Sequence, residues 1–153
     1  MPNMPGSGLL TRLLANYSPR AADLRAWADA RGQGMDLGSY WLPAGSVVGT
    51  DDGEQAAISG AYTRGAWEGI VQPMLATLGA RAPDRQARFD ELRTGYFRDY
   101  FTQWANFQAR FQEGRTLWRG RYPELLARAG GAEDPYARFF RDAQRDLYEL
   151  PID

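Results

Sequence analysis

Large apolar residues recur every three or four positions over 89–111, which is the spacing of one face of an α-helix. This row consists of Phe89, Leu92, Tyr96, Tyr100, Trp104, Phe107 and Phe111. A second row through Phe97 and Phe101 meets it at Trp104 and widens the stripe beyond a coiled-coil seam. We therefore predict a central helix over 84–113, with Trp104 buried at the centre of a core that other helices cover.

The predicted helix ends carry capping signals. The Asp84 carboxylate can accept hydrogen bonds from the first turn of the central helix, and Gly114 can end that helix. Thr63 stands where it would cap a helix over 64–78, which Pro73 should bend or divide. The apolar face of this second helix consists of Trp67, Ile70, Val71, Met74, Leu75 and Leu78.

Two more helices are expected nearer the two ends of the chain. A Ser-Pro pair begins a helix over 19–31, which Gly32 would end in the left-handed conformation. Asp134 and Pro135 give the same start signal to a helix over 135–147. The residues expected to face inward are Leu24, Trp27 and Ala28 in the first helix and Tyr136, Phe139, Phe140, Ala143 and Leu147 in the second.

The segment 33–59 interrupts the helical pattern with repeated glycines and a proline. Tyr40-Trp41-Leu42 forms a small apolar anchor within it. The stretch 46–49, followed by Asp-Asp-Gly, is compatible with a short hairpin that returns along 55–58. Because so long a loop is uncommon in a compact domain and is often functional, this segment is a candidate contact region.

The fold predicted from these patterns is mainly α, a helical bundle around one long aromatic helix with an irregular loop. We predict a single domain over 1–153, with residues 1–8 disordered and a short helix over 9–15. No apolar run approaches the roughly 20 residues needed to cross a bilayer, and the first residues lack the features of a signal peptide. The last residues, Leu150-Pro-Ile-Asp153, look truncated, and the sequence does not indicate whether the chain is a fragment or a complete protein.

Composition excludes several kinds of chemistry. The chain has no cysteine and no histidine, so it offers no disulfide, no thiol nucleophile and no Ser-His-Asp triad of its own. The formal net charge of −1 gives no electrostatic case for nucleic acid or for an anionic membrane surface. We therefore expect protein partners; the sequence does not indicate an oligomeric state.

The acidic residues do not form a recognisable site. Asp51-Asp52-Gly53-Glu54 lacks the alternating ligands of a calcium loop and is better explained as a turn. Glu68 has no second carboxylate at the separation that glycoside hydrolysis needs, so a solvated helix face explains it. Alternating arginine and aspartate between Arg138 and Asp146 are expected to form an exposed, ion-paired face. We predict no catalytic residue, no metal and no cofactor.

Three stretches in order resemble one family. The motif Gly60-Ala-Tyr62-Thr63-Arg-Gly-Ala-Trp67, which leads into a helix, resembles a motif in the C-terminal periplasmic region of IcmF/TssM proteins. The sequence from Tyr96 to Phe107 resembles the Tyr-x-x-x-Tyr-x-x-x-Trp helix of that family, with Tyr100 and Trp104 at the other two positions. The stretch Asp134-Pro-Tyr-Ala-Arg-Phe-Phe is similar to the capped helix that follows it.

The resemblance implies a setting as well as a fold. IcmF/TssM proteins are inner-membrane scaffolds of type VI secretion systems, so the resemblance implies the helical part of their periplasmic region and a non-enzymatic, structural role. Its partners would be secretion-complex subunits or effectors. The chain departs from the family at Ser59, where a proline is common, and it lacks the β-sandwich that docks the outer-membrane lipoprotein.

Two other functions fit the sequence. The first is a stand-alone adaptor or immunity-like protein that binds one partner through the loop 33–59. The second, which we rank last, is a carboxylate-based hydrolase of cell-wall glycan. For a binding role, the candidate contact residues are Tyr40, Trp41, Trp118 and Tyr122, because Tyr and Trp combine a large apolar area with a polar atom.

Overall fold

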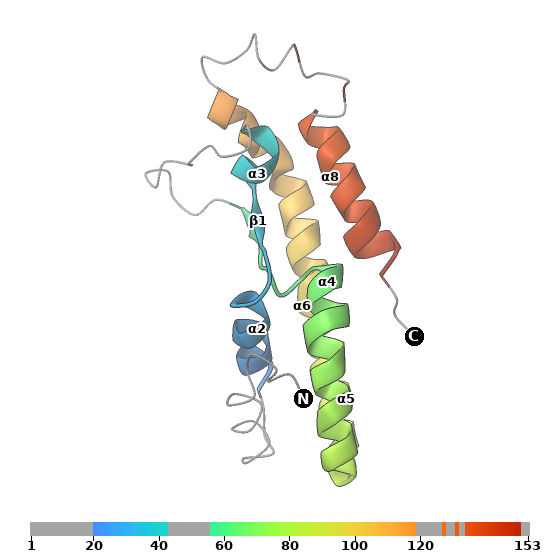
Figure 1. The fold of residues 1–153 in the computed structure, drawn as a ribbon. Coiled ribbons are helices and arrows are strands. Elements are labelled where there is room, and N and C mark those ends of the chain that lie inside the picture. Colours follow the sequence, from blue (N-terminus) through green and yellow to red (C-terminus); the bar gives the residue numbers. More distant parts are fainter. Residues whose placement is uncertain (1–19, 43–55, 119–126, 128–130, 132–133, 151–153) are drawn as a thin grey trace. The chain divides into compact units, whose positions relative to one another are not determined.

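The computed structural model describes residues 20–42, 56–118, 127, 131 and 134–150 of the 153-residue chain (Figure 1). The expected helix over 9–15, the Ser-Pro start of the next helix, the acidic stretch 51–54 and Tyr122 lie outside these residues. The structure groups the chain into two compact units. Unit 1 consists of Met1–Gln33 and Gly60–Tyr100, and unit 2 consists of Gly34–Ser59 and Phe101–Asp153.

The described residues are mainly helical, as the sequence predicts. The α-helices are α2 (Ala21–Asp29), α3 (Leu37–Trp41), α4 (Arg64–Ala66), α5 (Gln72–Arg81), α6 (Gln86–Arg110) and α8 (Pro135–Ala143). The 3-10 helices, which are tighter than an α-helix, are η2 (Pro83–Arg85) and η3 (Phe111–Trp118). The π-helical turns, which are wider, are η1 (Trp67–Val71) and η4 (Gln144–Tyr148). The strands are β1 (Met35–Asp36) and β2 (Ala57–Ile58).

In unit 1, the second helix begins at the predicted cap. Thr63 has an extended backbone, and its side-chain oxygen accepts a hydrogen bond from the Ala66 amide at 3.1 Å. The helix then changes type, because α4 passes into the π-helical turn η1 before α5 begins at Gln72. Pro73 lies in the first turn of α5, where its missing N–H costs little. The backbone therefore stays helical through Pro73, and the change before it is one of hydrogen-bond type and not a division.

Two glycines in unit 1 are required by close backbone approach. A Cβ on Gly32 would overlap with the carbonyl oxygen of Gly60, and a Cβ on Gly60 would lie 2.6 Å from the Gly32 carbonyl carbon. The Gly60 amide also donates to the Asp29 carboxylate at 3.0 Å. Neither glycine has a positive φ, so the predicted left-handed ending at Gly32 is wrong. Glycine is needed there because two backbone segments cross.

The core of unit 1 is aromatic. Tyr62, Trp67 and Tyr96 are each at most 4% exposed, and the Trp67 ring lies 4.5 Å from that of Phe97 between centroids. The Tyr96 hydroxyl donates to the Ala61 carbonyl, so its polar atom is satisfied inside the core. The motif from Gly60 to Trp67 thus has structural tasks: a backbone crossing, a helix cap and two core rings.

Helix α6 contributes its first part to unit 1 and the remainder to unit 2. All seven residues of the first aromatic row are buried, with Trp104 only 1% exposed, so the central prediction is confirmed. The end predictions are wrong: Asp84 lies inside the turn η2 and makes no cap, and Gly114 lies inside η3. Phe101 is 42% exposed, so the second row does not continue inward beyond Phe97.

In unit 2, the predicted loop 33–59 contains structure. Strand β2 pairs antiparallel with β1, with Met35 opposite Ile58. The stretch 46–49, which the predicted hairpin pairs with 55–58, lies outside the described residues. Asp36 then caps α3, because its carboxylate accepts from the Ser39 amide at 2.8 Å. The sequence analysis did not predict this helix, because it is only five residues long and its apolar periodicity is weak.

Helix α8 begins as predicted. The Asp134 carboxylate accepts from the Tyr136 amide at 2.9 Å, and Pro135 occupies the first turn. The helix continues beyond Ala143 as the π-helical turn η4. Phe139 and Ala143 are buried, but Phe140 is 67% and Tyr136 38% exposed, so the predicted inward face is too wide. The ring of Phe139 packs on α6 at Trp104 and Phe107, as the centroid distances of 6.0 and 5.7 Å show.

Candidate functional site

Two of the four predicted contact residues lie in the interior of unit 2. Tyr40 and Trp41, in α3, are each 2% exposed. The Tyr40 ring lies within 6 Å of Phe107, Phe111 and Phe139, measured between centroids. As placed, these two rings fix α3 to its neighbours and offer no face to a partner, so the expectation of an exposed contact surface at Tyr40 and Trp41 is corrected.

The position of Trp41 explains why Gly114 is a glycine. The indole Nε1–H donates to the Phe111 carbonyl at 3.0 Å, which brings the ring against the start of η3. A Cβ on Gly114 would overlap with Cδ1 of this ring. Gly114 therefore makes room for a buried tryptophan and does not end a helix. Of the other predicted contact residues, Trp118 is the last residue of η3, and its side chain lies outside the described residues, as does all of Tyr122.

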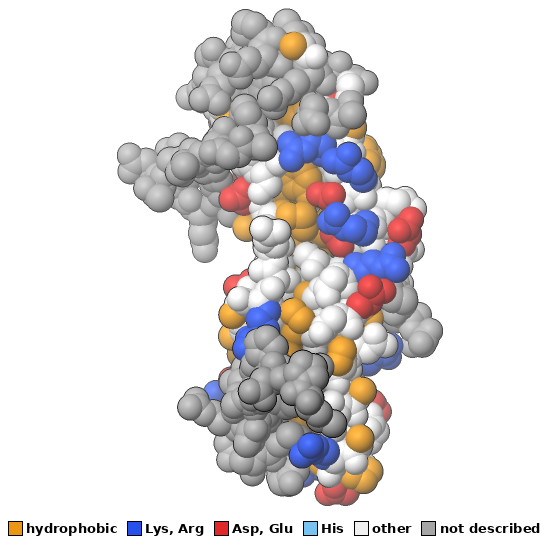
Figure 2. All heavy atoms as spheres, viewed as in Figure 1, with side chains coloured by type: hydrophobic (Ala, Val, Ile, Leu, Met, Phe, Trp, Pro, Cys, Tyr) orange, Lys and Arg blue, Asp and Glu red, His pale blue; other side chains and the backbone are white. Residues whose placement is uncertain are grey.

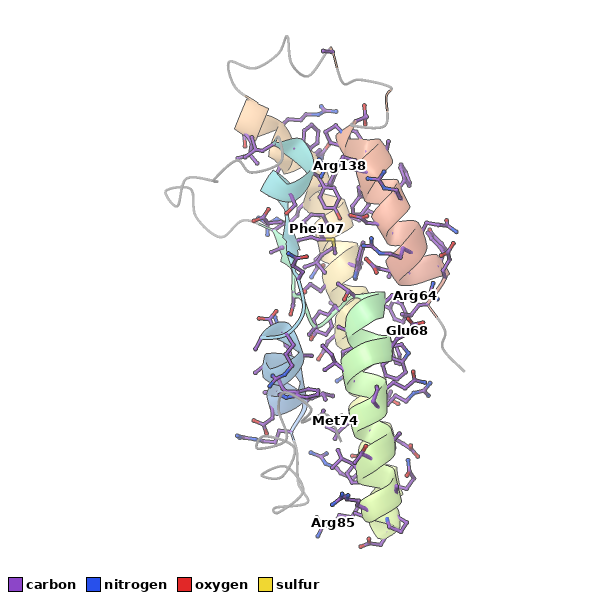
Figure 3. All side chains as sticks on the ribbon, in the orientation of Figure 1. Arg64, Glu68, Met74, Arg85, Phe107 and Arg138 are labelled. Atoms are coloured by element: carbon purple, nitrogen blue, oxygen red, sulfur yellow. The ribbon has the colours of Figure 1, made fainter. Side chains whose placement is uncertain are left out.

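A cluster of polar side chains joins α3 to α8 next to these aromatic rings. The Tyr40 hydroxyl donates to Asp142 Oδ2 at 2.7 Å. Burial of the ring and the hydrogen bond to this carboxylate raise the pKa of Tyr40 well above its usual value, so Tyr40 stays a neutral donor. Arg138 donates to the Ser39 carbonyl at 2.8 Å and to the Tyr40 carbonyl at 3.3 Å (Figure 3). A cation thus satisfies carbonyls near the C-terminus of α3.

The same cluster contains a buried carboxylate. Asp146 is 1% exposed, and Arg145 holds it with two hydrogen bonds, Nη2 to Oδ2 at 2.8 Å and Nε to Oδ1 at 3.1 Å. Arg145 also lies 3.5 Å from Asp142. The sequence places Asp146 on a solvated face, and this is wrong. A signal existed, because Asp146 stands three residues after Ala143 and seven after Phe139, on the inward stripe of the helix.

These groups pair with one another, and that limits their chemistry. Both aspartates are engaged by Tyr40 or Arg145, an arrangement typical of a structural network that fixes two elements together. In the described part of the chain, no three His, Cys, Asp or Glu side chains come together closely enough to hold a metal ion. In unit 1, Glu68 is ion-paired with Arg64 at 3.1 Å on an accessible helix face, as the sequence predicts.

The surface of unit 1 has a hollow of about 630 Å³ beside Ala21, Leu92 and Gly95, which is open to solvent. Its charged lining includes Arg88 and Glu91, which form an ion pair with each other at 3.3 Å. Figure 2 shows basic and acidic side chains interspersed on the face it presents, with no large area of one sign.

Exposed rings are the feature of unit 2 that the sequence interpretation missed. The large apolar side chains that the structure leaves exposed, among the described residues, are Phe101, Tyr136, Phe140 and Tyr148, all in unit 2. Three of them belong to one stripe with a spacing of four residues: Tyr136, Phe140 and, after Gln144, Tyr148. That spacing was available in the sequence, but the inward and outward stripes of α8 both carry aromatics, so periodicity alone could not separate them.

Comparison of the chain with protein families, with curated proteins and with solved structures gave no match in any of the three. Among the described residues, none of the helices combines the length and the apolar character that crossing a bilayer requires.

Proposed function

We propose that this chain is a non-enzymatic, structural and protein-interaction module. The particular setting we propose is the one that the resemblance implies: the helical part of the periplasmic region of an IcmF/TssM-type scaffold in a type VI secretion membrane complex. Its partners would be other subunits of that complex or secreted effectors.

The observation that supports a scaffold is the use of the motif residues. Thr63 caps a helix, Gly60 permits a backbone crossing, and Trp67 and Tyr96 pack in a core. These are structural tasks, and they are the tasks that a scaffold protein needs such a motif to perform. The paired aspartates of unit 2 support the same proposal, since each carboxylate stabilises the packing of α3 or α8.

A binding measurement tests the proposal. The purified chain should bind at least one purified subunit of a type VI membrane complex, or one effector, from the same organism. The proposal also expects that the chain releases no soluble fragments from peptidoglycan. Binding to none of these proteins, together with turnover of peptidoglycan, would reject both the scaffold and the non-enzymatic role.

Two variants refine the test at the predicted contact residues that the structure does not describe. Trp118→Ala and Tyr122→Ala should weaken binding if these side chains contact the partner, provided that circular dichroism shows each variant folded. Trp41→Ala serves as the opposite control, because its side chain is buried and its loss should lower stability first. Unchanged affinity in folded Trp118→Ala and Tyr122→Ala would move the contact surface elsewhere on the chain.

A further inference from the structure

The Tyr40 hydroxyl has a single hydrogen and lies within hydrogen-bond distance of two acceptors. Its oxygen is 2.7 Å from Asp142 Oδ2 in α8 and 2.9 Å from Met35 Sδ in β1. A carboxylate is a strong acceptor and a thioether is a weak one, so the hydroxyl donates to Asp142. The Met35 sulfur therefore lies against a donor that is already engaged, and it keeps its lone pairs.

The two partners of this contact differ in their surroundings. The Tyr40 ring is 2% exposed and is held by Phe107, Phe111 and Phe139 in the core of unit 2. Both residues of β1, in contrast, are only partly buried, so a small oxidant in solution has access to Met35. A fixed hydroxyl donor thus lies next to a sulfur that solvent reaches.

Hydrogen peroxide converts a methionine sulfur into a sulfoxide. The sulfur lone pair attacks one peroxide oxygen, and an S–O bond forms while the O–O bond breaks. The displaced hydroxide takes up the proton of the transferred oxygen and leaves as water, so the sulfur is oxidised by two electrons and the peroxide is reduced. The product is polar and chiral, and its oxygen is a much better hydrogen-bond acceptor than a thioether sulfur.

We propose that Met35 is a redox-modification site, and that its oxidation by peroxide loosens the attachment of α8 to α3. With a sulfoxide at this position, two strong acceptors compete for the one hydrogen of Tyr40. The acceptor that loses the hydrogen is left without its donor where water has little access, since the Asp142 side chain is only 20% exposed. The proposal does not depend on the secretion-system setting.

Other contacts keep α8 in place when this hydrogen bond is weakened. Arg138 donates to the carbonyls of Ser39 and Tyr40, and neither bond uses the Tyr40 hydroxyl. Asp142 also keeps Arg145, which lies 3.5 Å from its other oxygen. We therefore expect oxidation to lower the local stability of α8 in a chain that stays folded.

Peroxide treatment of the purified chain tests the modification and its consequence. Mass spectrometry of peptides should show that Met35 gains an oxygen atom before Met74, which is 3% exposed. Amide hydrogen exchange in α8 should then become about tenfold faster, the factor expected for the loss of a hydrogen bond to a charged group. A methionine sulfoxide reductase should restore the slower exchange.

Two variants separate Met35 from the other methionines of the chain, Met1, Met4 and Met74. Met35→Leu removes the sulfur with little change in volume, so exchange in α8 should no longer respond to peroxide. Met74→Leu is the matched control in unit 1, and its response should equal that of the wild type because Met35 is unchanged. Circular dichroism establishes that each variant is folded.

Tyr40→Phe tests the competition for the hydrogen. This variant has no hydroxyl to divert, so oxidation of Met35 should accelerate exchange in α8 much less than in the wild type. Asp142→Asn provides a second test if Tyr40→Phe does not fold. Its side chain keeps an acceptor oxygen without the charge, so it has a weaker bond to lose and should also respond less to peroxide.

Three results would overturn the proposal. The first is resistance of Met35 to peroxide under conditions that oxidise free methionine. The second is a Met35 sulfoxide that leaves exchange in α8 unchanged. The third is equal acceleration in the wild type and in folded Tyr40→Phe, which would assign the effect to the polarity of the sulfoxide and not to competition for the hydroxyl hydrogen.

Discussion

Both units pack aromatic side chains in their cores, but they differ in the side chains that they leave exposed. In the described part of unit 1, Tyr62, Trp67, Tyr96 and Phe97 are buried. Arginine covers two of these rings: the Arg93 guanidinium carbon lies 5.5 Å from the centroid of Trp67, and that of Arg25 lies 5.5 Å from the centroid of Tyr62. Unit 2 also has an aromatic core, but it buries the carboxylate of Asp146 and leaves Phe140 and Tyr148 exposed.

This difference indicates where a contact role should be sought. Exposed apolar patches can mark interaction sites, and a buried ion pair adds little net stability. Unit 2 has both features on one continuous helical segment: Phe140 is exposed on α8, and η4 carries the exposed Tyr148 and the buried Asp146. A contact surface is therefore best sought on α8 and η4.

The largest expected effect separates buried from exposed rings within α6. Trp104→Ala should lower the free energy of unfolding by about 3–5 kcal/mol, because it opens a cavity among Phe139 and its neighbours. Phe101→Ala, three residues earlier and 42% exposed, should cost well under that. Denaturant unfolding of both variants measures the difference. Equal losses would show that exposure in unit 2 does not mark a ring as dispensable to folding.

The buried ion pair should respond unequally to removal of its two members. Arg145→Ala strands the Asp146 carboxylate in the interior and should cost about 3 kcal/mol, near the lower end of the range for broken buried pairs. Asp146→Ala leaves an arginine whose side chain is 54% exposed and can be hydrated, so the loss should be smaller. Chemical denaturation of both variants provides the comparison. A larger loss for Asp146→Ala would contradict the view that burial of the carboxylate sets the cost.

The backbone crossing of unit 1 should be sensitive to a single methyl group. Gly60→Ala forces a Cβ against the backbone of Gly32 and should cost about 1–3 kcal/mol through overpacking. Gly65→Ala is the matched control five residues later, because a Cβ there meets nothing within 4 Å and should be neutral or slightly stabilising. Thermal unfolding of the two variants measures this difference. Equal midpoint temperatures would mean that the backbones of Gly32 and Gly60 can move apart to accommodate the added methyl group.

The helix cap of unit 1 should contribute less. Thr63→Ala removes the acceptor for the Ala66 amide and should cost about 1 kcal/mol, while Thr63→Ser should retain most of the stability. Urea unfolding measures both changes. Retention of full stability by Thr63→Ala would show that water replaces the cap without cost.

The smallest effect near neutral pH should become visible in alkali. Burial raises the pKa of Tyr40 in the folded chain above the value of about 10 expected in the unfolded chain. The unfolded state therefore releases protons first, so this stabilisation is complete below about pH 10 and is lost as the pH rises further. Unfolding measured from pH 7 upward should show that decline, and it should be shallower in Tyr40→Phe. An identical alkaline slope in both proteins would exclude a contribution from Tyr40.

The sequence by itself determined the helices with strong periodicity and strong caps. The aromatic row of α6, the Thr63 cap and the Asp134-Pro135 start all follow from local rules, because 3.6-residue periodicity and side-chain capping act within a few residues. The prediction of a mainly helical chain rested on these signals and was confirmed.

Tertiary structure decided the features that depend on contacts between elements distant in the sequence. Gly32 and Gly60 lie 28 positions apart in the sequence, and only their meeting requires both to lack a side chain. Asp146 is an ordinary surface residue by type, and it is buried because Arg145 and the packing of α3 and α8 compensate its charge. Whether Phe139 or Phe140 faces inward depends on which neighbour α8 meets, so the exposed face of α8 became apparent only when the elements were brought together.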